Sequence, residues 1–266
     1  LFAVVIPTKA VADRPFGLVY TGKTSWNPES GELVFGSSGS MPETLEGFYW
    51  TVPSEVRRIV IGEGVMLKGA FRVPARDEAN PLEIAGKNRE TSVLFGTTEE
   101  QWTTRHQVAD NAKWRYGAIC VLADALVSVH HLTSQNPRGY HISGYAKKAV
   151  IHVRSCNLID TRGGDNNNSD GFVGAAGSSI SDTFISTSDD GIKLYKDILI
   201  RDVTIEQHRN GAPIQFGWES DAEPVKATIE NLTIRGVDSQ QLYNMAPFTW
   251  QGGAVGSRDV LISGLK

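Results

Sequence analysis

Hydrophobic and polar residues alternate over short stretches through the second half of the chain. The pattern apolar-x-apolar-x-x-apolar-x-apolar recurs, most fully at Ile198, Ile200, Val203 and Ile205. Alternation at period two predicts strands with one buried face, and the doublet in the middle of the pattern predicts a bend between two strands. Strands are expected over six segments: 126–132, 149–159, 179–185, 197–205, 227–234 and 259–265.

These six segments resemble one another and are spaced as repeats. Successive segments start 18 to 31 residues apart, which is typical of a stacked solenoid. Because the repeats contain only strands, with Asn, Gly, Ser and Asp in the turns, they predict an all-β chain folded as a right-handed parallel β-helix. A β-sandwich of similar length is the alternative. The uneven spacing is compatible with the β-helix, since insertions enter loops on one side of a solenoid, and the β-helix is the preferred interpretation.

The first third of the chain is less regular. Strands are expected over residues 48–52, 57–61 and 65–73, and residues 99–112 predict at most one or two helical turns. We expect a single β-helix domain over residues 1–266. Residues 1–50 are expected to form a cap or first coil, because the end of a solenoid needs a cover over its apolar layer.

Composition and charge exclude several classes of protein. Hydrophobic residues make up 40% and charged residues 21%, which is typical of a soluble globular chain. The net charge of -4 argues against a general nucleic-acid binder, which needs a basic stripe. No segment approaches the roughly 18 apolar residues of a membrane span. We therefore expect neither a nucleic-acid nor a membrane partner. The chain is expected to be a monomer.

The N-terminal segment, the two cysteines and one polar segment are candidate signals of processing, disulfide formation and metal binding. The apolar opening has no basic region before it and is not expected to be a signal peptide, and the chain is expected to be a trimmed product or a piece of a longer polypeptide. Cys120 and Cys156 either form a disulfide or remain as core thiols. Residues 161–170 resemble a calcium loop, but Asp170 and Ala176 stand where that loop needs Gly and Glu. No metal or other cofactor is expected.

Three aspartates suggest a chemistry. Asp170 precedes Asp189 by 19 residues and Asp190 by 20, and glycine follows both sites. In coils of that size the three side chains would stack on neighbouring strands, which lie about 4.8 Å apart. Hydrolysis of a sugar bond with inversion uses one protonated carboxyl and one carboxylate that activates water, roughly 6.5–9.5 Å apart. Close carboxylates also raise one another's pKa, so one of them stays protonated near neutrality.

The alternative is that these aspartates are solvated turn residues. In a regular strand Asp189 and Asp190 would point to opposite faces. Both reach one cleft only where the backbone bends, and Ser188 and Gly191 favour such a bend. The matching Asp-Gly pair at Asp170, one coil earlier, favours a shared site over a simple turn.

Three stretches together carry a family resemblance: Asn168-Ser-Asp170-Gly, then Ser-Asp189-Asp190-Gly-Ile-Lys193-Leu-Tyr195, and His208-Arg-Asn-Gly-Ala-Pro213-Ile-Gln215-Phe-Gly-Trp218. In their order and spacing they resemble the catalytic region of glycoside hydrolase family 49, which contains dextranases and isopullulanases. The resemblance extends over about residues 65–250. A Gly-His-Gly tripeptide, which follows the aspartate pair in the related polygalacturonases, is missing here.

The resemblance implies a right-handed parallel β-helix that hydrolyses α-glucosidic bonds with inversion. It implies that Asp189 is the general acid and that Asp170 and Asp190 hold the attacking water. Lys193 would lie near the acid and the substrate. The expected substrate is an α-glucan such as dextran or pullulan, and the expected location is extracellular. The alternatives are a β-helix polysaccharide lyase and a β-helix that only binds glycans.

Other residues are candidates for contacting the sugar. Aromatic rings can pack on the CH faces of pyranoses, although each ring can equally serve in the core. The candidates are Trp218, Trp250, Tyr195 and Tyr243, and Trp218 is the leading one because it ends the Gln215-Phe-Gly-Trp stretch one coil beyond the aspartates. Gln215 could hydrogen-bond a hydroxyl. His208 could touch substrate, but a lone histidine is more often structural.

Overall fold

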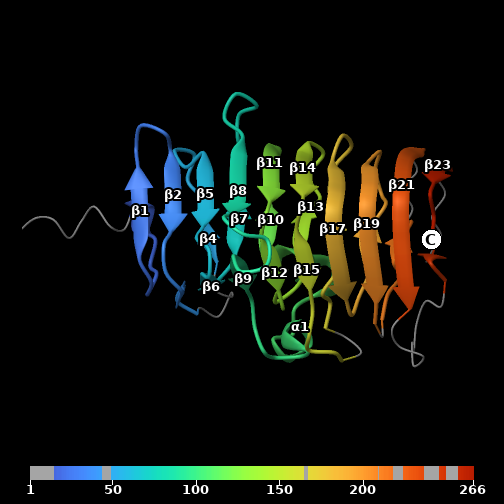
Figure 1. Cartoon of the computed structure of the whole chain (residues 1–266), viewed down its shortest axis with the longest axis horizontal. Coiled ribbons are helices and arrows are strands. Elements are labelled where there is room, and N and C mark those ends of the chain that lie inside the picture. Colours follow the sequence, from blue (N-terminus) through green and yellow to red (C-terminus); the bar gives the residue numbers. More distant parts are fainter. Residues whose placement is uncertain are drawn as a thin grey trace, which may run out of the picture.

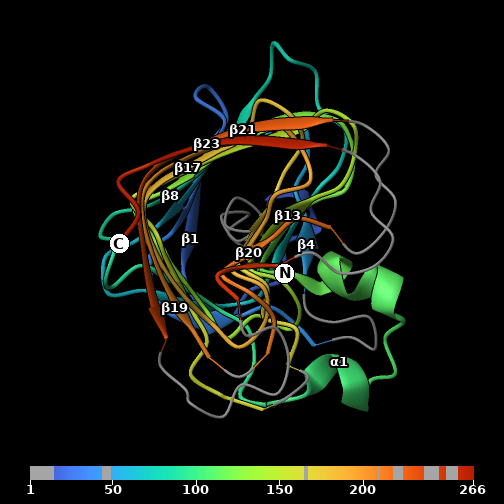
Figure 2. The same cartoon turned by 90° about the vertical axis from the view of Figure 1, so that its right-hand side faces the viewer.

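The computed structural model describes residues 15–43, 49–164, 167–208, 210–217, 224–236, 246–249 and 257–266. Strands dominate these residues and pair almost entirely in parallel. In Figure 1 they stand side by side along the long axis, in sequence order from β1 (Thr24–Asn27) to β23 (Arg258–Ser263). Seen along that axis in Figure 2, the coils wind around a common core. The parallel β-helix predicted from the repeats is confirmed.

The coils have three faces. The first face contains β2 (Glu32–Phe35), β5 (Arg58–Ile61), β8 (Leu82–Gly86), β11 (Ala125–His130) and β14 (Ala149–Arg154). The second face contains β3 (Gly39–Ser40), β6 (Met66–Lys68), β9 (Val93–Phe95), β12 (Thr133–Gln135) and β15 (Asn157–Ile159). The third face is a separate sheet of β4 (Trp50–Thr51), β7 (Phe71–Val73), β10 (Ile119–Val121), β13 (Ile142–Gly144), β16 (Phe172–Val173), β18 (Ile192–Lys193), β20 (Ile214–Gln215) and β22 (Phe248–Thr249).

Long strands join the first face to the second toward the C-terminal end. These strands are β17 (Ser179–Thr187), β19 (Leu199–Gln207) and β21 (Val225–Gly236). Each bends at one residue with a positive φ: Asp182 at 44°, Asp202 at 52° and Asn231 at 54°. Asn and Asp adopt this left-handed conformation more readily than most residues. The three residues lie at equivalent positions of successive strands and together form a column at which each coil turns. The predicted bend is therefore confirmed.

Columns of large apolar residues fill the space between the faces. On the first face one such column consists of Leu33, Ile59, Ile84, Val129, Val153, Ile180, Ile200, Ile229 and Ile262. On the third face the aligned residues are Trp50, Phe71, Ile119, Ile142, Phe172, Ile192, Ile214 and Phe248. Because a side chain of one coil packs on the equivalent side chain of the next, each coil is stabilised mainly by its two neighbours.

This packing predicts a large effect at Ile200, which is fully buried between Ile180 and Ile229. Ile200→Ala should lower the free energy of unfolding by about 2–5 kcal/mol, because the fixed coils cannot close the cavity. Leu199→Ala is the matched control, since this neighbouring residue faces outward and is only partly buried. Urea unfolding measures both. Equal losses in the two variants would contradict the column as the source of stability.

The largest insertion lies between β9 and β10. It contains α1 (Trp102–Arg105) and the 3-10 helix η3 (Asp110–Tyr116), which agree with the short helical turns expected over 99–112. Figure 2 shows α1 outside the ring of coils. No helix in the ranges that the structure describes is long and apolar enough to cross a membrane.

The N-terminal end differs from the parallel stack. The 3-10 helix η2 (Pro15–Gly17) precedes β1, which pairs antiparallel with β2. Residues 1–14 and 44–48 of the expected cap lie outside the described residues, so the cap and the single-domain boundary stay predictions.

Both cysteines are free and buried. The core-thiol alternative is therefore the one observed, and the disulfide alternative is excluded. Burial raises the pKa of each thiol to about 12, so neither is a nucleophile near neutral pH.

Candidate functional site

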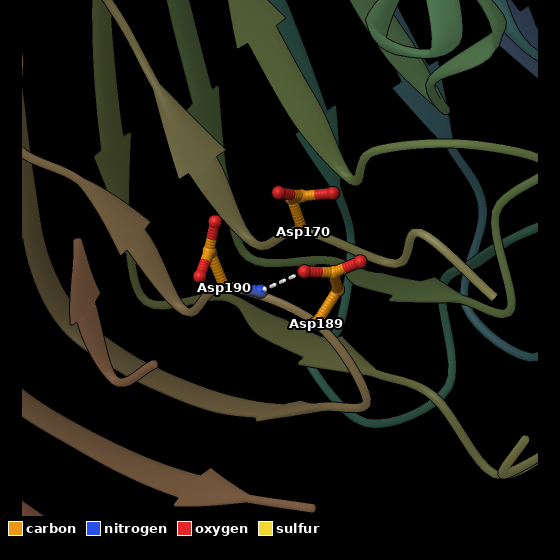
Figure 3. Close-up of side chains that lie close together, drawn as sticks. All are labelled: Asp170, Asp189 and Asp190. Carbon is orange, nitrogen blue, oxygen red and sulfur yellow. Dashed lines mark hydrogen bonds between the residues drawn. The ribbon is translucent and has the colours of Figure 1, made fainter. Parts of the chain in front are cut away.

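The three predicted aspartates lie together at the turn between the second and third faces. β17 ends at Thr187 and β18 begins at Ile192, so Asp189 and Asp190 occupy the turn between them. Asp170 occupies the equivalent turn one coil earlier, because Phe172 pairs with Ile192. Figure 3 shows the three carboxyl groups converging, and one oxygen of each lies within 4.8 Å of the others.

The glycine after each site is required by the close approach of neighbouring coils. A Cβ atom at Gly171 would lie 2.3 Å from the carbonyl oxygen of Gly191. A Cβ atom at Gly191 would lie 2.7 Å from the carbonyl oxygen of Pro213. No side chain fits at either distance, so the repeated Asp-Gly pair reflects both the stacking of the coils and the chemistry of the aspartates.

The bend at Asp189 and Asp190 is held from both sides. The hydroxyl of Thr187 and the amide Nε2 of Gln207 each donate to the carbonyl oxygen of Asp189, both at 2.9 Å. The backbone N–H of Asp190 donates to Asp189 Oδ1 at 2.8 Å. Gly211 lies so close that a Cβ there would be 2.3 Å from the nitrogen of Asp190. The backbone bend that the sequence requires is therefore present, and both side chains reach the same cluster.

Lys193 joins two of the aspartates. Its Nζ lies 2.7 Å from Asp170 Oδ1 and 2.5 Å from Asp190 Oδ2, and all three side chains are almost completely buried. Burial acts to lower the pKa of Lys193, but the charges of Asp170 and Asp190 outweigh it and raise that pKa well above its ordinary value. The ammonium group thus occupies the position between Asp170 and Asp190 that a divalent cation would need.

Asp189 has a different environment from the other two carboxyl groups. Its Oδ2 accepts from the side-chain amides of Asn168 and Asn210, each at 3.2 Å, so these donors are neutral. Burial, and then the charge of Asp190, raise the pKa of Asp189 to about 6. The carboxyl group of Asp189 is thus able to hold a proton close to neutral pH.

The pKa of Asp170 is also shifted upward. Burial and the charge of Asp189 raise it, while the ammonium group of Lys193 opposes the rise. Both carboxyl groups are thus able to hold a proton, and because their charges repel each other, ionisation of one favours protonation of the other.

A buried polar network supports the segment that carries Asp170. Arg162 makes a paired contact with Asp160, at 3.0 and 3.1 Å, and Asn167 Nδ2 donates to Asp160 Oδ2 at 2.5 Å. The hydroxyl of Ser169 donates to Asn167 Oδ1 and accepts from the backbone N–H of Ser188. The polar side chains of the segment that resembles a calcium loop are thus largely occupied with contacts to one another. Residues 165 and 166 of this segment lie outside the described residues.

The predicted substrate-binding residues are only partly brought to this cluster. Gln215 pairs in register with Lys193, and the hydroxyl of Tyr195 donates to Gln215 Oε1. His208 Nε2 lies 2.7 Å from the hydroxyl of Ser186 on the neighbouring long strand, as a structural histidine would. Trp218, Tyr243 and Trp250 lie outside the described residues.

Three residues beside the cluster were missed by the sequence reasoning. Asn168 and Asn210 donate to Asp189, and the ring of Tyr140 lies 5.3 Å from Lys193 Nζ. Asn168 and Asn210 did fall within the quoted motifs, two residues before Asp170 and inside His-Arg-Asn-Gly. Tyr140 carries no local signal, because it meets Lys193 only through the register of β13, β16 and β18.

No family model matches the chain. Among solved structures, an alginate lyase from Paenibacillus sp. str. FPU-7 aligns with 78% of this chain and 91% of its own. The sequence identity in that alignment is 14% and the TM-score is 0.33.

Two curated proteins match in sequence. The dextranase of Arthrobacter sp. (strain CB-8) is 21% identical over 199 residues, and that of Arthrobacter globiformis is 20% identical over 199 residues. Each match covers 72% of this chain but 31% of the relative, so the chain spans about a third of the length of these dextranases. The predicted resemblance is confirmed as a distant relationship over the chain: it is a distant relative of dextranases, which are enzymes of glycoside hydrolase family 49.

Proposed function

We propose that this chain is an extracellular glycoside hydrolase that cleaves the α-glucosidic bonds of a polysaccharide such as dextran or pullulan. The observation that carries the proposal is the asymmetry of the aspartate cluster. Lys193 contacts Asp170 and Asp190, whereas Asp189 is held by neutral amides and has a pKa of about 6. One protonated carboxyl beside two lysine-bound carboxylates is the set of groups that such a hydrolysis needs.

In the proposed reaction Asp189 donates its proton to the oxygen of the glycosidic bond. The bond between that oxygen and the anomeric carbon then breaks, and the leaving sugar departs as an alcohol. A water molecule held by Asp170 and Asp190 attacks the anomeric carbon and gives its proton to one of these carboxylates. The proton then returns to Asp189 through solvent, so that the enzyme is restored.

The stereochemistry of this reaction rests on the family resemblance. The approach of the carboxyl oxygens to within 4.8 Å is shorter than the separation of about 6.5–9.5 Å typical of inverting pairs. That separation alone therefore does not favour inversion over retention. The configuration of the newly formed reducing end decides between them.

Reducing-sugar release from a panel of α-glucans and uronate polymers tests the proposed activity. Release from an α-glucan, unaffected by EDTA, is the expected result. Release with EDTA-sensitive formation of unsaturated ends on a uronate polymer would instead identify a lyase. Binding of a polymer without release of sugar would identify a glycan-binding protein.

The proposed acid predicts the pH dependence of activity. Because Asp189 must be protonated, kcat/KM should fall as the pH rises through about 6. The raised pKa also means that the folded state binds more protons than the unfolded state between pH 3.8 and about 6. The stability that Asp189 contributes should therefore be present below pH 3.8 and be lost as the pH rises through about 6.

Rate and stability profiles of the parent and of Asp189→Asn measure these two effects. In the variant the contribution of this group to the stability profile should disappear. An unchanged stability profile in Asp189→Asn would show that another group titrates near pH 6.

The extracellular location is tested by fractionating the producing cells with an antibody against the chain. Recovery of the protein with the cytosol would contradict it.

A further inference from the structure

Aromatic rings continue from the aspartate cluster toward the N-terminal coils. Tyr195 follows β18, Tyr145 follows β13, and Trp114 belongs to η3. The ring centroids of Tyr195 and Tyr145 are 6.5 Å apart, and those of Tyr145 and Trp114 are 5.1 Å apart. Tyr145 is 41% exposed although it contacts both neighbours. These three rings, here called the aromatic strip, form a connected surface along the helix axis.

The two tyrosines meet across one intervening coil. The register of Ile142, Phe172 and Ile192 aligns β13, β16 and β18, and the positions three residues further on are Tyr145, Ala175 and Tyr195. The two tyrosines therefore belong to coils about 10 Å apart, two strand spacings. Ala175 is buried in the coil between them, and its backbone N–H donates to the carbonyl oxygen of Ala149.

The strip begins at the proposed reaction centre. Lys193 Nζ lies 5.9 Å from the ring centroid of Tyr195 and 5.3 Å from that of Tyr140. The same Nζ contacts Asp170 and Asp190 directly. The aromatic strip therefore lies next to any sugar that is bound at these carboxylates, on the side of the N-terminal coils.

We propose that Tyr145 and Trp114 are binding subsites for further sugar units of the same polysaccharide chain. The inference rests on the proposed function and extends it, because it assigns the direction in which the polymer lies: along the helix axis, from the aspartates over Tyr145 to Trp114. Aromatic rings provide a large apolar contact area and can pack on the CH face of a pyranose. The substrate class that fits is an uncharged glucan of several units.

Binding of α-glucan oligosaccharides of increasing length to the Asp189→Asn protein, measured by calorimetry, tests this inference without turnover. Adding Tyr145→Ala or Trp114→Ala should each weaken binding of the longer oligosaccharides by roughly 2- to 10-fold. The shortest ligands that still bind should be unaffected. Tyr145→Phe keeps the ring and should retain the affinity. In the active enzyme the same alanine variants should raise KM and leave kcat nearly unchanged.

Trp26→Ala is the matched control. Trp26 is also partly buried and packs edge-on against Phe16, at 5.2 Å, near the N-terminal end of the coils. It should leave the affinity unchanged. If the enzyme hydrolyses a glucan but both strip variants bind long oligosaccharides as the parent does, the proposed binding role of the aromatic strip is contradicted and the proposed function is not. If no glucan is bound or hydrolysed, both proposals are contradicted.

Discussion

The Asp189→Asn variant is expected to fold like the parent and to lose turnover by about 10²- to 10⁴-fold, the usual contribution of a general acid. An asparagine has the same shape, and its Oδ1 can still accept from the backbone N–H of Asp190. It has no proton to donate to a leaving oxygen. It also removes the repulsion with Asp190 that helps raise the pKa of Asp189, but its amide nitrogen cannot accept the two hydrogen bonds from Asn168 and Asn210. These effects oppose each other, so stability above pH 6 should be close to that of the parent.

Asp202→Asn is the control for this experiment. Asp202 is an exposed aspartate at the bend of β19, where its Oδ1 accepts from Asn231 at 2.9 Å. It should keep full activity. Steady-state kinetics on the best glucan, with circular dichroism to verify the fold, compares the two variants. Full turnover in Asp189→Asn would remove Asp189 as the acid.

The second large effect is expected at Lys193. Lys193→Met should lower the free energy of unfolding by about 3–5 kcal/mol, because it leaves Asp170 and Asp190 buried without their counter-charge. Activity should fall as well, since the pKa of Asp170 should rise further and its carboxylate would no longer be available to activate water. Urea unfolding at neutral pH and again at low pH measures the first effect. The loss should shrink at low pH, where a carboxyl group takes up a proton and needs no cation.

Arg201→Met is the matched control for Lys193→Met. Arg201 forms an ion pair with Glu230 at 2.5 Å, but its side chain is half exposed, so water can replace the partner. Little change in stability is expected. A Lys193→Met protein as stable as the Arg201→Met protein at neutral pH would contradict the view that the ammonium group compensates the buried carboxylates.

The fold could be predicted because the solenoid repeats its local pattern. The spacing of Ile200 and Val203 predicted the bend that the structure places at Asp202. The expected strand over 149–159 is instead two strands, β14 and β15. The chain turns at Ser155, whose φ is 53°. A serine carries a weaker turn signal than the Asp and Asn at the later bends, so the alternation of apolar residues concealed the break.

The aspartates of the site could also be predicted, since Asp-Gly recurs at the length of one coil. The partners of Asp189 could not, because Asn168 and Asn210 reach it from the coils on either side. Contacts of this kind depend on the register between coils, and a shift of one residue would remove them. The upward shifts of the pKa values of Asp170 and Asp189 likewise depend on which carboxyl groups Lys193 contacts. The aromatic strip was missed because Tyr145 and Tyr195 lie 50 residues apart in the sequence.

Proton NMR of an α-glucan during digestion by the enzyme tests the proposed hydrolysis most directly. Hydrolysis predicts a saturated reducing end, and the family resemblance predicts that this end appears first as the β-anomer and only later mutarotates. An end that appears first as the α-anomer would contradict inversion while leaving hydrolysis in place. An unsaturated sugar end, formed without uptake of water, would contradict the proposed chemistry of the aspartate cluster.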